Sequence, residues 1–241
     1  MVALEKRGEA CLGEQMKLTY FGHACFQVET GGFRLLFDPF IRPNALAAQV
    51  DLAAIKADVI FVSHGHEDHM ADLVELAAQT GAVVVSNWEI YEWLSGSALK
   101  NLHPMNQGGS SELCFGKVKM VNAVHSSTLP GGLAGGNPVG FVVSTAEGTF
   151  YYSGDSALTM DMKLIGEEFE IGFAVLPIGD RFTMGAKDAA KAAGFVGTRT
   201  VVGVHYNTFP PIEISKEAAL AEFDKAGVRL LLPGIGETVE I

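Results

Sequence analysis

The sequence predicts an α/β (α+β) protein built as a four-layer αββα sandwich in a single domain. The chain divides into two halves, and each half runs from short hairpin-forming strands into alternating strands and helices. No linker rich in proline, serine or charge separates the halves, and 241 residues suit one large domain. Two such halves can pack sheet against sheet with their helices outside.

The first half opens with hairpins. Residues 1–15 are polar and aperiodic, so we expect an N-terminal extension or leader there, followed by a domain spanning 16–241. Strands are predicted for KLTYF, CFQVE and FRLLFD, which turns containing glycine separate. The continuous apolar run ADVIFVS (57–63) is typical of a strand buried on both faces.

Helices follow in both halves. MADLVELAAQTG has apolar residues at helical spacing and ends on Gly81, and NWEIYEWLSG predicts a short helix with Asn87 as its N-cap. The second half predicts strands at KVKMVNAV, VGFVVST, TFYYSG, IGFAVLPIG, TVVGVH, VRLLLP and ETVEI. Helices are expected over 185–195 and from about Ser215 to Ala226.

Composition narrows the class of protein. A formal net charge of -11 disfavours nucleic-acid partners and an anionic membrane surface, because both require clustered Lys and Arg. Three cysteines without a CxxC pair predict no disulfide framework and favour the cytoplasm. The chain shows no signal-peptide pattern and no apolar run long enough to span a bilayer. A small-molecule substrate is therefore the expected partner, and a homo-oligomer is left open.

The segment FVSHGHEDHM (61–70) concentrates metal-binding side chains. Three of the seven histidines lie within six residues, at His64, His66 and His69, and Asp68 stands among them. Neutral imidazoles and carboxylates are good ligands for a borderline divalent ion such as zinc. The tight H-x-H-x-D-H spacing suits two adjacent ions better than one, so further ligands must come from elsewhere in the chain.

Three later positions supply those ligands. His125, Asp155 and His205 each follow a predicted strand. A lone histidine at a strand end is usually structural, but the combined set of seven predicts a metal site by ligand type and number.

These motifs resemble the metallo-β-lactamase superfamily over residues 16–241. YFGHACF, SHGHEDH, IGDRFTMG and HYNTFP are similar to segments of uncharacterised metal-dependent hydrolases related to L-ascorbate-6-phosphate lactonase. The resemblance implies that His64, His66 and His125 hold one metal ion, and that Asp68, His69 and His205 hold a second. Asp155 would then bridge the two ions, and Asp38 would orient a ligand histidine.

The resemblance also implies a reaction. Two divalent ions would share a hydroxide that cleaves a lactone, phosphodiester or amide bond in a small substrate, with Asp68 as the catalytic residue that orients the nucleophile or shuttles its proton. Zinc (Zn2+) is the default metal, and Mn2+, Fe2+ or Ni2+ also suit nitrogen and oxygen ligands.

Four residues outside the ligand set are candidate substrate contacts: His23, Asn137, Arg181 and Asn207. The glycine-rich segment 130–140 is interpreted as a lid, and His103 as a structural residue in a turn before proline.

Three other classes compete with a hydrolase. A di-iron redox protein of the same fold usually carries glutamate where this chain has His66. A nuclease of the superfamily would need a basic face, which an acidic chain does not offer. A metal-binding module without catalysis stays open beside them.

Overall fold

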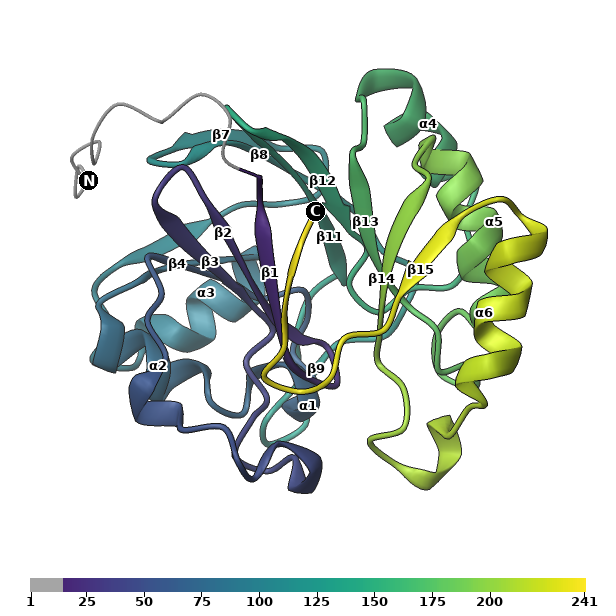
Figure 1. Cartoon of the computed structure of the whole chain (residues 1–241). Helices are drawn as coiled ribbons and strands as arrows, with labels where there is room; N and C mark the ends of the chain where they lie inside the picture. Colours follow the sequence, from purple (N-terminus) through teal and green to yellow (C-terminus); the bar gives the residue numbers. More distant parts are fainter. Residues whose placement is uncertain (1–14) are drawn as a thin grey trace.

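The protein, described here by a computed structural model of residues 15–241, contains two seven-stranded sheets that face each other (Figure 1). Residues 1–14, which include nearly all of the expected leader, lie outside the described residues. The first sheet has the order β16-β1-β2-β3-β4-β5-β6 and the second β15-β14-β13-β12-β11-β8-β7.

The first sheet is formed by β1 (Lys17–Gly22), β2 (Cys25–Thr30), β3 (Phe33–Phe37), β4 (Val59–Phe61), β5 (Val83–Ser86), β6 (Leu102–Pro104) and β16 (Thr238–Glu240). The second is formed by β7 (Ser110–Leu113), β8 (Gly116–Asn122), β11 (Val139–Thr145), β12 (Gly148–Tyr152), β13 (Phe173–Pro177), β14 (Thr200–Val204) and β15 (Arg229–Leu231). A separate small hairpin pairs β9 (Thr128–Leu129) with β10 (Leu133–Ala134).

The helices cover the outer faces of the sheets. The helices are α1 (Glu67–Met70), α2 (Leu73–Thr80), α3 (Trp88–Ser95), α4 (Asp161–Glu168), α5 (Ala186–Val196) and α6 (Lys216–Lys225). Short 3-10 turns span Ala45–Ala47, Leu52–Ala54 and Pro210–Ile212. Figure 1 shows α2 and α3 outside the first sheet and α4, α5 and α6 outside the second, which confirms the expected four layers. Among the described residues, none of these helices has the length and apolar character needed to cross a bilayer.

Side-chain alternation along the strands explains the layers. Phe37 and Phe61 point into the core between the sheets, whereas Leu36 and Ile60 beside them pack under the outer helices. In the second sheet Tyr152 enters the central core, while the adjacent residue on the strand belongs to the core under α4–α6. Each sheet is therefore apolar on both faces, which is why the sequence shows continuous apolar runs in these strands.

The predicted helix ends agree with the structure. The Asn87 side chain accepts a hydrogen bond from the Ile90 N–H, and Ser215 caps α6 in the same way. Gly81 ends α2 in the left-handed conformation at φ 70°.

Several elements differ from the expectations. The apolar run at 57–63 contributes only Val59–Phe61 to the sheet, because the chain turns into the histidine segment directly afterwards. The turn expected at His103 is wrong: the residue lies in β6, paired with β5, because the extended backbone favoured before proline also suits an edge strand. The final strand β16 pairs with β1, so the C-terminal segment returns to the first sheet.

Candidate metal centre

The seven predicted ligands lie at the junction of the two halves. His64 and His66 follow β4, and α1 carries Asp68 and His69. The other three follow strands of the second sheet: His125 comes after β8, Asp155 after β12 and His205 after β14. Because ends of strands from both sheets meet here, residues separated by well over a hundred positions become neighbours.

His64, His66 and His125 form the first group. One ligand atom from each lies within 4.8 Å of the others. His66 Nδ1 is 2.9 Å from His64 Nε2, while His66 Nε2 faces Ser126 Oγ at 3.5 Å. His66 therefore presents Nδ1 to the group, and His64 presents Nε2.

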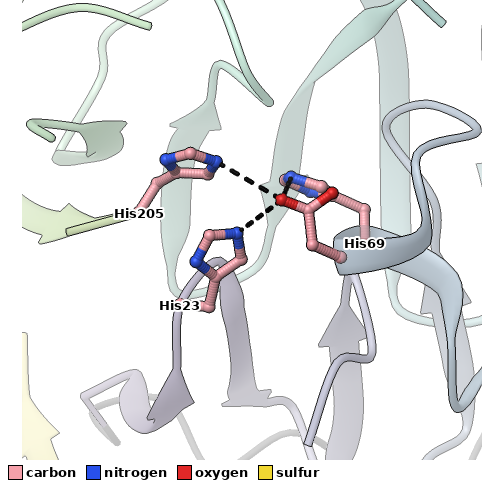
Figure 2. Close-up of side chains that lie close together, drawn as sticks. His23, His69 and His205 are labelled. Carbon is pink, nitrogen blue, oxygen red and sulfur yellow. Dashed lines mark hydrogen bonds and ion pairs between the residues drawn. The ribbon is translucent and has the colours of Figure 1, made fainter. Parts of the chain in front are cut away.

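The second group contains Asp68, His69 and His205, and the structure adds His23 to it. Figure 2 shows the three imidazoles directed at one carboxylate oxygen, which is Asp68 Oδ2. The distances from that oxygen to the Nε2 atoms are 3.0 Å for His23, 4.0 Å for His69 and 3.8 Å for His205.

Asp155 lies between the two groups. Its Oδ2 is 3.6 Å from His125 Nε2 of the first group. The same oxygen is 3.3 Å from His69 Nε2 and 3.0 Å from His205 Nε2 in the second. One carboxylate thus contacts both groups, which is the position that a bridging ligand requires.

The donor atoms are arranged to bind a metal ion rather than to form hydrogen bonds with one another. His69 donates its Nδ1–H to Asp38 Oδ2 at 2.8 Å. In the neutral ring Nε2 then has only a lone pair, and it is buried without a hydrogen-bond partner among the described residues. Two carboxylates nevertheless lie close to it, so a cation is the partner that this arrangement suits.

Asp38 fixes the tautomers of histidines in both groups. It is fully buried and accepts from the Ser63 N–H at 2.7 Å, the Ser63 hydroxyl at 2.6 Å and the Tyr152 hydroxyl at 2.6 Å, besides His69. Ser63 Oγ gives its only proton to Asp38, so at its 2.9 Å contact with His64 Nδ1 it must accept. His64 Nε2 is therefore left unprotonated, as a metal ligand must be.

The electrostatics match these roles. Burial lowers the pKa values of His64, His66 and His125, which keeps the first group neutral. Burial opposes the charge of Asp155, yet His205 and His69 hold its pKa well below the usual range. The pKa of His69 is raised despite its burial, because Asp155, Asp38 and Asp68 surround it. The second group thus attracts positive charge.

His23 occupies an unusual position for a substrate contact. It lies in the turn between β1 and β2, is almost fully buried, and has φ 55°. Burial and the neighbouring His205 lower its pKa to about 4. The sequence analysis expected only a substrate contact for this residue.

The other three candidate substrate contacts have neighbours outside the ligand set. Asn137 is exposed, with its amide nitrogen 3.4 Å from Gln107 Oε1. Arg181 is exposed beside the Phe182 ring at 5.8 Å. Asn207 Oδ1 accepts from the Ile214 N–H at 2.8 Å and so holds the loop after β14. Their contacts with substrate stay predictions.

The glycine-rich segment contains part of the β9–β10 hairpin rather than an open loop. Asn87 Nδ2 donates to the carbonyl oxygens of Gly135 and Asn137, and the Ser127 hydroxyl accepts from the Gly65 N–H beside the histidine segment. Leu133 near its tip is exposed. A lid role for this hairpin stays a prediction.

Backbone strain concentrates near the site. The non-glycine residues with positive φ in the described chain are His23, Asp38, Asp180, Arg181, His205 and Asn207. Such conformations cost about 1–3 kcal/mol each and persist where the surroundings impose them, often at functional sites. Three supporting residues were not identified from the sequence: Ser63, Tyr152 and Thr208. Their only signal was a place inside the quoted segments SHGHEDH, TFYYSG and HYNTFP.

Comparisons with known proteins agree with this geometry. A beta-lactamase superfamily domain model matches residues 17–205. A UPF0173 metal-dependent hydrolase of Flavobacterium johnsoniae is 45% identical over 226 residues, covering 94% of this chain and 100% of the relative. A second relative of the same description, from Methanopyrus kandleri, is 43% identical over 230 residues, with 93% of this chain and all of the relative covered.

A solved structure extends the similarity. Igni18, described as a novel metallo hydrolase from Ignicoccus hospitalis, is 33% identical with a TM-score of 0.85, over 94% of this chain and 98% of that one. The chain therefore belongs to the beta-lactamase superfamily, in its group of metal-dependent hydrolases.

Proposed function

We propose that the protein is a cytoplasmic hydrolase that uses two divalent metal ions, with zinc as the default, to cleave a lactone, phosphodiester or amide bond in a small molecule. The observation that carries the proposal is the contact of Asp155 Oδ2 with both ligand groups. When bound, such ions lower the pKa of water and polarise the oxygen of the bond that is attacked.

The surrounding residues divide the remaining tasks. Asp155 and Asp68 differ in exposure: the Asp155 side chain is 4% exposed and that of Asp68 is 30% exposed. A buried carboxylate suits a bridging ligand, whereas Asp68 can also face water and substrate. Asp68 would therefore orient the attacking water and hold its proton.

Charge favours a small substrate over a nucleic acid. The chain carries a net charge of -11, and a macromolecular polyanion would need a basic surface that this composition does not favour. A local metal site still attracts a carboxylate or phosphate on a small molecule.

The test is a panel of lactone, phosphodiester and amide substrates with zinc-reconstituted protein. We expect turnover on at least one class, and we expect His66→Ala to abolish it, because His66 Nδ1 faces the first group. His103→Ala is the matched control, since His103 is a half-buried histidine of β6 outside the ligand groups. Full turnover by folded His66→Ala would contradict the proposal.

A further inference from the structure

His23, in the turn between β1 and β2, packs against aromatic rings and lies close to three candidate metal ligands. Its ring lies 4.1 Å from the His205 ring, and Phe209 packs edge-on at 5.3 Å. One ligand atom from each of His23, Asp68, His69 and His205 lies within 4.8 Å of the others. Burying an imidazole costs free energy, so its polar atoms must find partners.

The Nδ1 side of the ring meets a directional partner. Nδ1 is 3.0 Å from Thr208 Oγ1, and that hydroxyl donates to the Tyr206 carbonyl oxygen at 3.5 Å. A carbonyl only accepts, so Thr208 then accepts from the Nδ1–H of His23. In this tautomer Nε2 has a bare lone pair 3.0 Å from a carboxylate oxygen. A cation between them would satisfy both acceptors at that separation.

The donor-atom distances suit side chains that would hold one ion. With metal–ligand distances of about 2.0–2.1 Å, two ligands of the same ion lie at most about 4.2 Å apart. The longer distances, 4.0 and 3.8 Å, join Asp68 to His69 and His205. The shorter distances, 3.3 and 3.0 Å, join those two histidines to Asp155. His23 Nε2 lies 3.0 Å from Asp68 Oδ2, so it would be within reach of the same ion.

The backbone holds His23 against the second sheet. The His205 N–H donates to the His23 carbonyl oxygen at 2.7 Å, and the Tyr20 hydroxyl donates to the same oxygen at 3.1 Å. Both histidines have φ 55°. His205 Nδ1 is buried without a partner among the described residues, so this clamp and the ring contact take the place of an outer hydrogen bond.

We propose that His23 Nε2 is an additional protein ligand of the second metal ion, beside Asp68, His69 and His205, with Thr208 setting its tautomer. The inference rests on the proposed function for the presence of the metal ions, and it is independent of which bond is cleaved. Because its test measures metal binding, it succeeds or fails separately from the substrate panel.

The experiment is a zinc titration of metal-free protein against a chromophoric chelator, with cobalt spectra of the second ion. His23→Gln keeps an amide that can donate to Asp68 but is a poor ligand. We expect it to bind the first ion as the wild type does and to weaken the second more than about 100-fold, beyond the 10–100-fold typical of an outer partner. The cobalt bands of the second ion should also shift in energy.

A second variant, Thr208→Val, tests the proposal without replacing His23, so it keeps the proposal testable if His23→Gln does not fold. Thr208→Val removes the hydroxyl without touching the donor atoms, and we expect it to weaken the second ion by about 10–100-fold. His103→Ala is the control and should match the wild type. Wild-type affinity and unchanged cobalt bands in His23→Gln would overturn the proposal, and so would wild-type affinity in Thr208→Val.

Discussion

Asp38 shows how one residue organises the site. It is buried at φ 44°, and its two carboxylate oxygens accept from Ser63, His69 and Tyr152. Through Ser63 it also sets the tautomer of His64. A single carboxylate therefore orients one histidine of each candidate ligand group.

Asp38→Asn tests this arrangement, because asparagine tolerates positive φ and so changes mainly the charge and the acceptors. We expect a loss of about 1.5–3 kcal/mol in the free energy of unfolding, the contribution of a hydrogen bond to a buried charged group. We also expect weaker binding of both metal ions. Ser63→Ala should weaken only the first ion, since the contact of Asp38 with His69 survives. Urea unfolding and zinc titration measure the two effects, and equal behaviour of the two variants would contradict the assignment.

The structure brings together the seven candidate ligands that the sequence indicated, whereas the residues that support them were not visible in the sequence. H-x-H-x-D-H and the three later positions stand out because ligand types recur after apolar runs. His23 is a lone histidine in a turn, and a tautomer depends on neighbours such as Thr208 that only the folded chain brings near.

At the level of the element, β12 shows how alternate residues meet different surroundings. Tyr152 points between the sheets and donates to Asp38 at 2.6 Å. Tyr151 points the other way, and its hydroxyl is buried without a partner among the described residues. The two adjacent tyrosines therefore allow a direct comparison of a buried hydroxyl that has a hydrogen-bond partner with one that has none.

Replacing each tyrosine by phenylalanine should give opposite results. Tyr152→Phe removes a hydrogen bond to a charged group, and we expect the free energy of unfolding to fall by about 1.5–3 kcal/mol. Tyr151→Phe removes an unpaired buried hydroxyl, and we expect the free energy of unfolding to rise by about 1 kcal/mol. Urea unfolding at neutral pH measures both, and a destabilised Tyr151→Phe would show that the hydroxyl has a partner.

The same residues predict an alkaline limit to stability. Burial raises the pKa values of Tyr151 and Tyr152 above 10.0, so the folded state keeps protons that the unfolded state releases. Their contribution is complete below pH 10 and is lost as pH rises above that value. Above pH 10, each such tyrosine lowers the free energy of unfolding by about 1.36 kcal/mol per pH unit. Tyr151→Phe should flatten the decline between about pH 10 and 11.5 in urea unfolding, and an unchanged slope would count against this assignment.

Close packing where β13 meets β14 gives another test. A Cβ on Gly179 would overlap the His205 carbonyl oxygen, so Gly179→Ala must displace a proposed ligand. We expect the free energy of unfolding to fall by about 1–3 kcal/mol and the second metal ion to bind more weakly. Gly194 lies in α5 with open space around it, and Gly194→Ala should stabilise by about 1 kcal/mol through helix propensity. Thermal unfolding and zinc titration compare them, and intact metal binding in Gly179→Ala would contradict the prediction.

Elements with strong periodicity or caps were predictable, and short ones were not. Asn87 and Ser215 marked helix starts because their side chains cap the backbone. The two-residue strands of the β9–β10 hairpin carry too little periodicity to identify. The α4 helix, which begins at Asp161, was missed because Met160 before it makes no side-chain cap.

For the whole molecule, the site depends on how the two sheets meet. The first sheet supplies the histidine segment, and the second supplies His125, Asp155 and His205. The four-layer arrangement followed from the order of hairpins and βα units, because two apolar sheet faces must cover each other. The return of β16 to the first sheet carried no such signal, since pairing between chain ends is not visible in local pattern.

The most direct test of a two-ion centre is a crystal structure of zinc-loaded protein with an anomalous difference map. We predict two peaks: one among His64, His66 and His125, and one among Asp68, His69 and His205, with Asp155 contacting both ions. A single peak, or zinc bound only away from these side chains, would contradict the account.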